Sequence, residues 1–312
     1  MQYGMRTRKL LVRLTAAAGL AALTTANAST FLTDGASHTW DTATPGSIVV
    51  TPGPSSPTNI DVVAGADIGE DLGIDTSLQL LGDATANIYG GILRQDLDAN
   101  STSVANVYGG DLQDDIYLYD GSTVNLDGGA VADDVYVYDA ATFNFYSGSI
   151  GGILEANGES TTTITGGTVG GDVIGFDIAT IQISNASITG DLAAINDSTI
   201  TLISGLLSPT SSLYTTEESS LEVYGYDFLV NGAPVDFDAD GIDHDGYRIL
   251  LVGAGAGTLS GYLSDGTAFD TTFFRDSSPD GSGHLVLFNV PEPTSIMLMA
   301  SGAMLVLLRR RA

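Results

Sequence analysis

The middle of the chain repeats itself at a fixed step along the sequence. From the second glycine of a "YGG" stretch, Gly91, each step of 19 arrives at a small residue: Gly110, Gly129, Gly148, Gly167, Ala186 and Gly205. Three apolar columns keep the same step: Leu97, Ile116, Val135, Leu154, Val173 and Leu192; Leu93, Leu112, Val131, Ile150, Val169 and Ile188; Ile88, Val107, Leu126, Phe145, Ile164, Ile183 and Leu202. Self-similarity at a fixed short period is typical of solenoids, whose repeats stack on their neighbours. The repeat therefore predicts a rod of stacked coils.

Alternation within each repeat indicates the kind of solenoid. In "TVNL", Val124 and Leu126 can point inward while Thr123 and Asn125 point outward. Helical spacing is absent, and β-branched and aromatic residues dominate. We therefore expect an all-β fold: a parallel β-helix or β-solenoid over residues 59–220, with two or three short strands per coil. Residues 221–289 alternate between Asn-Gly and Asp-Gly turns, which predicts a small antiparallel β module that caps the last coil.

The residues before the repeat differ in composition. Four of the nine prolines lie at Pro45, Pro52, Pro54 and Pro57, and none occurs between Pro57 and Pro209. Proline removes a ladder hydrogen bond, so residues 29–58 are expected to form an N-terminal cap and proline-rich linker. Residues 59–81 are expected to form a divergent first coil.

The charge is extreme and unevenly placed. The chain has 38 acidic and 10 basic residues, a net charge of −28, and most of the basic residues lie near the two ends. Residues 29–291 hold 37 acidic residues and three arginines, a net charge of −34. Phosphate binding needs arrays of lysine and arginine, so this body is not expected to bind nucleic acid or anionic lipid. It is expected to attract cations.

Residues 1–28 are typical of a secretory signal peptide. Basic residues precede a short apolar run, and Ala26-Asn27-Ala28 gives the small-x-small pattern that signal peptidase accepts. We expect cleavage before Ser29.

Residues 290–312 resemble a PEP-CTERM sorting signal. Pro291-Glu292-Pro293 precedes an apolar stretch, residues 296–308, and then Arg309, Arg310 and Arg311. The resemblance implies export in a Gram-negative bacterium that makes exopolysaccharide, with processing near the motif by an exosortase, a membrane-embedded cysteine protease. The arginines would stay on the cytoplasmic side. The apolar stretch is shorter than the roughly 20 residues that span a bilayer, so residues 290–312 are expected to contact the membrane only transiently.

Two polar columns are expected to face outward. One holds Asn87, Asn106, Asn125 and Asn144, continued by Thr163, Gln182 and Thr201; the other holds Thr123, Thr142, Thr161, Thr180 and Thr199. They could form a flat face for sugar hydroxyls or for ice, or simply hydrogen-bonded ladders that stack the coils. The second interpretation is favoured, and ice binding is set aside because the threonine column is expected at a turn.

An acidic and aromatic face is the first place to look for a contact site. Asp115, Asp134, Asp172 and Asp191 share a column, and like charges at strand spacing repel, so they either bind Ca²⁺ or form a solvated edge. The proposed contact face joins Asp133 and Asp134 to Tyr117, Tyr119, Tyr136 and Tyr138. The tyrosines could stack on sugar rings or serve as cross-strand pairs.

A second calcium candidate lies in "DFDADGIDHDG". Asp236, Asp238 and Asp240 match the first half of a D-x-D-x-D-G calcium loop, and Asp243 and Asp245 could complete the ligand set. The glutamate that ends an EF-hand loop is replaced by Tyr247, so the site would not be an EF-hand. A solvated acidic turn is the alternative.

Nothing in the sequence points to a catalytic centre. The body has no lysine, three arginines and three histidines, and no Gly-x-Ser-x-Gly, zinc or phosphate-loop motif occurs. The sequence therefore predicts a non-catalytic, structural or adhesive protein of the cell envelope or extracellular matrix, associated with exopolysaccharide, with calcium as the one candidate cofactor. The alternative is a β-helix enzyme that degrades polysaccharide, or a glycan-binding module.

Overall fold

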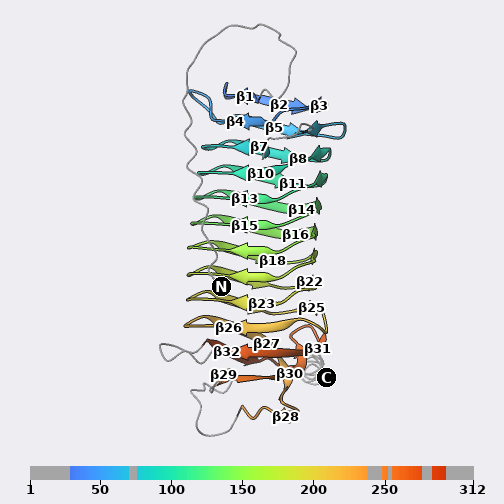
Figure 1. The fold of residues 1–312 in the computed structure, drawn as a ribbon, viewed down its shortest axis with the longest axis vertical. Helices are drawn as coiled ribbons and strands as arrows, with labels where there is room; N and C mark the ends of the chain where they lie inside the picture. The colour runs from blue at the N-terminus through green and yellow to red at the C-terminus, as the bar shows by residue number, and fades with distance from the viewer. Residues whose placement is uncertain (1–28, 70–75, 238–247, 252–254, 276–282, 293–312) are drawn as a thin grey trace, which may run out of the picture.

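The chain forms a parallel β-solenoid of ten turns, followed by a small region with antiparallel pairing (Figure 1). The computed structural model describes residues 29–69, 76–237, 248–251, 255–275 and 283–292. These residues form strands and turns and no helix. The predicted fold class is confirmed.

Each turn contributes to three faces, and like strands pair in parallel from turn to turn. Face 1 holds β1 (Thr30–Leu32), β4 (Ile48–Val50), β7 (Thr76–Leu80), β10 (Asp96–Ala99), β13 (Ile116–Leu118), β15 (Val135–Val137), β17 (Leu154–Ala156), β20 (Val173–Gly175), β23 (Leu192–Ala194) and β26 (Ser212–Thr215).

Face 2 holds β2 (Ser37–Trp40), β5 (Asn59–Val62), β8 (Thr85–Ile88), β11 (Val104–Val107), β18 (Thr161–Ile164), β21 (Thr180–Ile183), β24 (Thr199–Leu202) and the start of β27 (Ser220–Val230). Face 3 holds β3 (Ala43–Thr44), β6 (Asp67–Ile68), β9 (Ile92–Leu93), β12 (Asp111–Leu112), β19 (Thr168–Val169), β22 (Ala186–Ile188) and β25 (Gly205–Leu207). Two long strands, β14 (Thr123–Val131) and β16 (Thr142–Ile150), run through faces 2 and 3.

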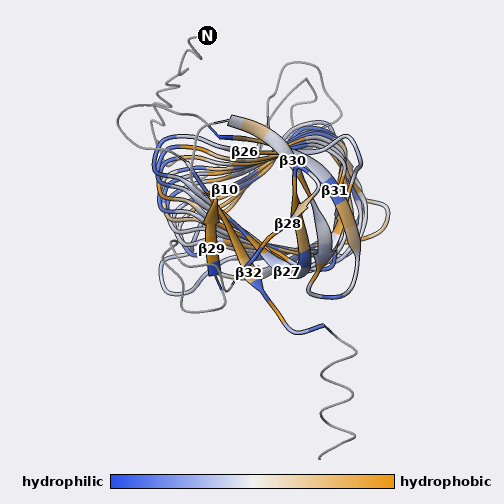
Figure 2. Cartoon of the chain, turned by 90° about the horizontal axis from the view of Figure 1, so that it is seen from below, coloured by the Kyte–Doolittle hydropathy of each residue, from blue (hydrophilic) through white to orange (hydrophobic). Residues whose placement is uncertain are grey.

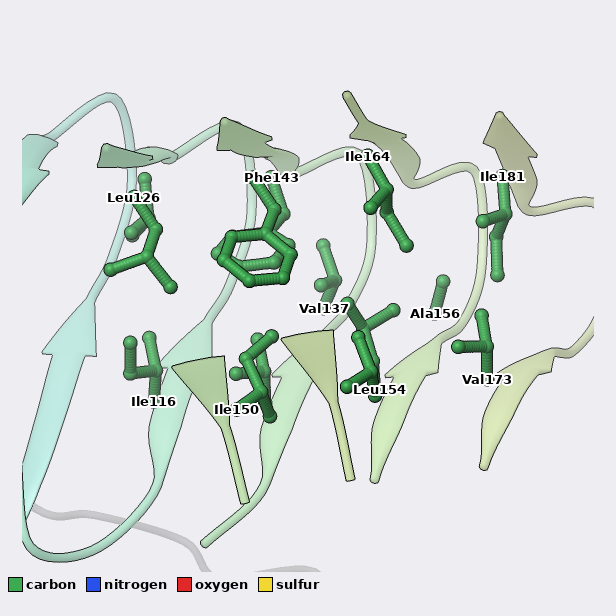
Figure 3. Close-up of a cluster of buried hydrophobic side chains, with 14 of the residues drawn as sticks. Ile116, Leu126, Val137, Phe143, Ile150, Leu154, Ala156, Ile164, Val173 and Ile181 are labelled. Atoms are coloured by element: carbon green, nitrogen blue, oxygen red, sulfur yellow. The ribbon is translucent and has the colours of Figure 1, made fainter. Parts of the chain in front are cut away.

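The three apolar columns fill the interior, as the alternation predicts. Leu97 pairs with Ile116, and Ile116 with Val135, so the ladder keeps the step of the repeat. All members of the three columns are at most 1% exposed. Figure 3 shows Leu126, Phe143, Ile150 and Ile164 pointing into the space between the faces, and Figure 2 looks along the rod at the superimposed coils. Burying each such side chain stabilises the fold by about 1.5–3 kcal/mol, so the rod is held by a continuous core rather than by disulfides.

Glycine is required at the corner between faces 2 and 3. Gly148 has φ +105°, and a Cβ there would lie 2.6 Å from the carbonyl oxygen of Gly129. Left-handed backbone and close approach both exclude a side chain. Where the column has Ala186, the left-handed conformation moves one residue back, to Asn185 with φ 53°.

The solenoid starts earlier in the chain than the repeat predicts. Residues 29–58, expected to be a cap and linker, contain four strands of the ladder. β1 pairs with β4, β2 with β5 and β3 with β6, and β4 also pairs with β7. Pro52, Pro54 and Pro57 lie exposed between β4 and β5, where they interrupt no ladder. These coils were hidden because loops of unequal length separate their strands, so the pairing of β1 with β4 and of β2 with β5 does not keep the step of the repeat.

The C-terminal region continues the rod before it closes it. β31 (Ala268–Arg275) and β32 (His284–Asn289) pair in parallel with β26 and β27 of the tenth turn. β28 (Ala233–Pro234), β29 (Arg248–Leu251) and β30 (Gly255–Leu263) add the antiparallel pairings at the same end. The module expected over 221–289 is thus partly parallel, because two of its strands extend the existing ladder.

Candidate functional site

Four tyrosines lie together on the outer surface of face 1, and we call Tyr117, Tyr119, Tyr136 and Tyr138 the tyrosine array. Tyr117 in β13 pairs in register with Tyr136 in β15. The residues on either side of each are buried in the core, so the alternation of the strand turns both tyrosines outward. Tyr119 and Tyr138 directly follow these strands. The array therefore follows from the register of two adjacent coils.

The rings of the array face one another. The ring centroids of Tyr117 and Tyr136 lie 5.1 Å apart with the planes 10° from parallel, and those of Tyr119 and Tyr138 lie 5.3 Å apart at 11°. Near-parallel rings at this distance are offset-stacked, so each covers part of its partner's face. Since a sugar ring stacks on a free aromatic face, the two ends of the array are its most open places for one.

Acidic residues lie at both ends of the array. Asp98 on β10 pairs in register with Tyr117, and Glu155 on β17 pairs with Tyr136. Neither was singled out from the sequence, although Asp98 precedes Tyr117 by one repeat step and Glu155 follows Tyr136 by one. The common step was the signal that could have found them.

The aspartate column bonds successive coils. Asp134 donates its backbone N–H to Asp115 Oδ1 at 2.9 Å, and Ile153 donates to Asp134 Oδ1 at 2.7 Å. Lower on the rod, Asp191 donates to Asp172 Oδ1 and Ser212 to Asp191 Oδ1, each at 2.7 Å. Each carboxylate thus accepts a backbone N–H of the next turn at the corner between faces 3 and 1. The column has a structural reason to repeat.

The second oxygens of two column aspartates hold the tyrosine array. Tyr117 donates its hydroxyl to Asp115 Oδ2, and Tyr136 to Asp134 Oδ2, both at 2.8 Å. Burial, followed by the bond to Asp115, raises the pKa of Tyr117; burial, followed by the bond to Asp134, raises the pKa of Tyr136. Burial raises the pKa of Tyr138 to about 12. Tyr117, Tyr136 and Tyr138 therefore stay protonated and add no charge at neutral pH.

Carboxylates beside the array could hold a cation. In each of two overlapping groups, one oxygen from every residue lies within 4.8 Å of the others: Asp96, Asp114 and Asp115, and Asp115, Asp133 and Asp134. Clustered carboxylate oxygens are the ligands that Ca²⁺ takes. Asp133 is exposed and Asp134 half-buried, so a cation could reach the second group from solvent.

Burial and the charges of neighbouring carboxylates disfavour the ionised forms of three aspartates near the array. Burial, and then the charges of Asp114 and Asp98, raise the pKa of Asp96 to about 7. Burial raises the pKa of Asp98, although hydrogen bonds from Thr76 and Gln79 oppose the shift. The adjacent charge of Asp134, and then burial, raise the pKa of Asp133. A bound cation or proton would relieve this repulsion.

The asparagine column on face 2 is a hydrogen-bonded ladder. Asn106 donates its amide to Asn87, Asn125 to Asn106, and Asn144 to Asn125, at 2.8–3.0 Å. Asn87 in turn donates to Asp61 at 2.9 Å. These amides are bonded to one another along the rod, which favours the stacking interpretation over a sugar-binding one.

The threonine column does not lie at a turn. Thr123, Thr142, Thr161, Thr180 and Thr199 are the first residues of face 2 strands and pair in register. The expectation of a turn was wrong, because each face 2 strand begins at its threonine. The position of the threonine column is therefore no longer a reason to set ice binding aside. The ladder of bonded amides beside the column still favours a role in stacking the coils.

The second calcium candidate lies mostly outside the described residues. Asp236 is exposed, close after β28. Asp238, Asp240, Asp243 and Asp245 fall in the range 238–247, which the structure does not describe.

Some residues of the two end signals lie within the described part of the chain and others lie outside it. Signal cleavage was expected between Ala28 and Ser29. Ala26 and Ala28 lie outside the described residues, whereas Ser29 is half-buried and bonds Ser47 side chain to side chain at 2.7 Å. Val290 separates β32 from Pro291 and Glu292, and its N–H donates to the Gly225 carbonyl at 2.8 Å, which holds the end of the strand. Pro293 and Arg309, Arg310 and Arg311 fall outside the described part.

A protein-family model described as the PEP-CTERM protein-sorting motif matches residues 289–311. The chain carries a PEP-CTERM sorting motif. The motif indicates an exported, surface-directed protein that an exosortase processes. No curated protein and no solved structure matches the chain. Within the described residues, no helix is long and apolar enough to cross a membrane, and the short apolar stretch of the PEP-CTERM motif lies beyond them.

Proposed function

We propose that this protein is a non-catalytic, structural or adhesive rod that associates with exopolysaccharide in the cell envelope or extracellular matrix of a Gram-negative bacterium. The observation that carries the proposal is the position of the PEP-CTERM motif: it begins where the last strand of an acidic, ten-turn solenoid ends. A rod with a continuous core and an export address is suited to a load-bearing role outside the cell.

Charge supports cations as the link to the polymer. The body carries a net charge of −34, so an acidic polysaccharide would be repelled unless divalent ions bridge the two. The clustered aspartates beside the tyrosine array are where such bridging would start. Titration of the exported protein with Ca²⁺ should raise its melting temperature, because a ligand that binds only the folded state stabilises it. No shift at millimolar Ca²⁺ would remove calcium from the proposal.

Cell fractionation tests the location. The exported protein is expected in the surface or matrix fraction, and a variant with Arg309, Arg310 and Arg311 replaced by glutamine is expected to leave it. A protein found only in the cytoplasm would contradict the proposal.

A polysaccharide-degrading enzyme is the second candidate, and Asp96 is the observation that favours it. A carboxyl group with a pKa of about 7 can act as a general acid near neutral pH, and Asp115 offers a second carboxylate nearby. Against it, Asp115 is already bonded to Tyr117 and to the backbone of Asp134. Release of reducing sugar ends from the polymer, abolished by Asp96→Asn, would establish the enzyme and overturn the structural role.

A further inference from the structure

The strands at the two ends of the rod differ in how they are paired. At the C-terminal end, β28, β29 and β30 add antiparallel strands around the last turn (Figure 1). At the other end, β1, β2 and β3 each pair with one strand only, β4, β5 and β6. Among the described residues no strand lies on their other side. The first turn therefore has an open edge.

Backbone groups at this edge point along the rod axis, away from the second turn. In β1 the N–H of Thr30 and the carbonyl of Leu32 bond the second turn, and so do the carbonyls of Trp40 in β2 and of Ala36 just before it. Backbone groups alternate in direction along a parallel strand, so those of Phe31, Ser37 and Thr39 face the open edge. An unpaired strand edge is a template for another strand.

Side chains at the edge suit a protein partner. Phe31 is 63% exposed, the highest value among the exposed large apolar residues of the described chain. Leu32 and Trp40 pack against the core but are only partly buried. The first turn therefore adds apolar surface to its unpaired backbone.

The distribution of charge favours contact between two copies of this chain at this end of the rod rather than along its sides. Residues 29–58 hold two acidic residues, Asp34 and Asp41, out of the 37 in the body, and Asp34 bonds His38 at 2.9 Å. Two copies of net charge −34 repel each other least when these first turns meet. The predicted cleavage before Ser29 would leave one residue ahead of β1, and so no segment to cover the edge.

We propose that two copies associate end to end through their first turns, with β2 of one copy pairing antiparallel to β2 of the other. A two-fold axis across the rod makes this contact self-complementary. The result is a double-length rod whose two outer ends are the C-terminal ends of the two copies. If that end of each copy stays at a cell surface, the pair would bridge two cells; this role rests on the proposed surface location, whereas the dimer itself does not.

Sedimentation of the exported, processed protein tests the dimer. We expect a concentration-dependent monomer–dimer equilibrium that strengthens with NaCl, because salt screens the repulsion. Thr39→Pro removes an N–H that faces the edge and no bond to β5, and it should weaken the dimer at least tenfold. Phe31→Asp should do the same. Leu206→Asp is the matched control, since Leu206 is 59% exposed on face 3, and it should leave the dimer unchanged. Retained melting temperatures would show that the variants fold.

Spin labels fix the geometry, because the chain has no cysteine of its own. Labels on a Thr39→Cys variant should lie within about 25 Å of each other, and labels on Thr161→Cys about 60 Å apart, at about 4.8 Å per turn. A monomer at every concentration, a dimer that survives Thr39→Pro, or short distances only at position 161 would overturn the proposal. Polysaccharide and calcium are absent from this assay, so its outcome is independent of the matrix role.

Discussion

The backbone N–H of Asp134 donates to Oδ1 of Asp115 at 2.9 Å, which joins two successive turns through a side chain that would otherwise only repel its neighbours. The same bond recurs at Asp172 and Asp191. The carboxylates that give the rod its charge therefore also hold its corner together. Structural and electrostatic roles fall on the same positions.

Replacing Asp134 with alanine should destabilise the rod by about 1–3 kcal/mol, because the N–H of Ile153 and the hydroxyl of Tyr136 lose a charged acceptor. Asp133→Ala is the matched control one residue away. Asp133 is exposed and lies against the charge of Asp134, so its removal should be neutral or slightly stabilising. Urea unfolding of both variants measures the difference; equal losses would show that the column is only a solvated edge.

Removing one amide from the asparagine ladder should destabilise the fold. Asn125→Ala breaks the bonds to Asn106 and Asn144 and should cost about 1–2 kcal/mol. Gln182→Ala, an exposed position in the same column, should cost less than about 0.5 kcal/mol. Thermal unfolding of the two variants compares them. A loss at Gln182 as large as that at Asn125 would mean that the ladder bonds do not matter.

Alanine at Gly148 should destabilise the fold by about 3 kcal/mol or more, because left-handed backbone and a Cβ 2.6 Å from the Gly129 carbonyl act together. Gly232→Ala separates the two causes: Gly232 has φ +75° and open space around the added Cβ. It should cost about 1 kcal/mol. Chemical denaturation gives both values, and similar costs would rule out close approach as the reason for the glycine column.

Asp96 should make stability fall as the pH rises. Its folded pKa of about 7 lies above the ordinary value of 3.8, so between these values the folded state binds more protons than the unfolded state. Stability is then lost as pH rises from about 4 to 7. Asp96→Asn should flatten this part of the profile and add on the order of 1 kcal/mol at pH 8, after screening by solvent. Melting temperatures from pH 4 to 8 test it; an unchanged slope in the variant would contradict it.

The repeat predicted those parts of the fold in which the turns have equal length. The pairing of Leu97 with Ile116, and of Ile116 with Val135, could be predicted because each residue lies one repeat step from the next. The first turn and β4 were missed because loops of different lengths at the corners break the step, although β1 and β4 still pair. β31 was missed as a ladder strand because Ser212 pairs with Thr272, across the whole of β27 to β30.

The sequence grouped the four tyrosines on one face, but it predicted neither how their rings lie nor that Asp98 and Glu155 flank them. Alternation turns Tyr117 and Tyr136 outward, but whether their rings face solvent or each other depends on side-chain torsions that a sequence pattern does not carry. The role of Asp115 was hidden for a similar reason: the N–H that it accepts belongs to the backbone of another turn. Because every residue except proline has a backbone N–H, the identity of the donor residue does not reveal such a hydrogen bond.

Co-sedimentation with exopolysaccharide shows whether the rod binds the polymer through calcium. The exported, processed protein is centrifuged with the exopolysaccharide of the cells that make it, in millimolar Ca²⁺ or in excess chelator. We expect the protein to sediment with the polymer in Ca²⁺, to return to solution with the chelator, and to leave the polymer length unchanged. A protein that stays in solution under both conditions, or a polymer that shortens in its presence, would overturn the proposed structural role.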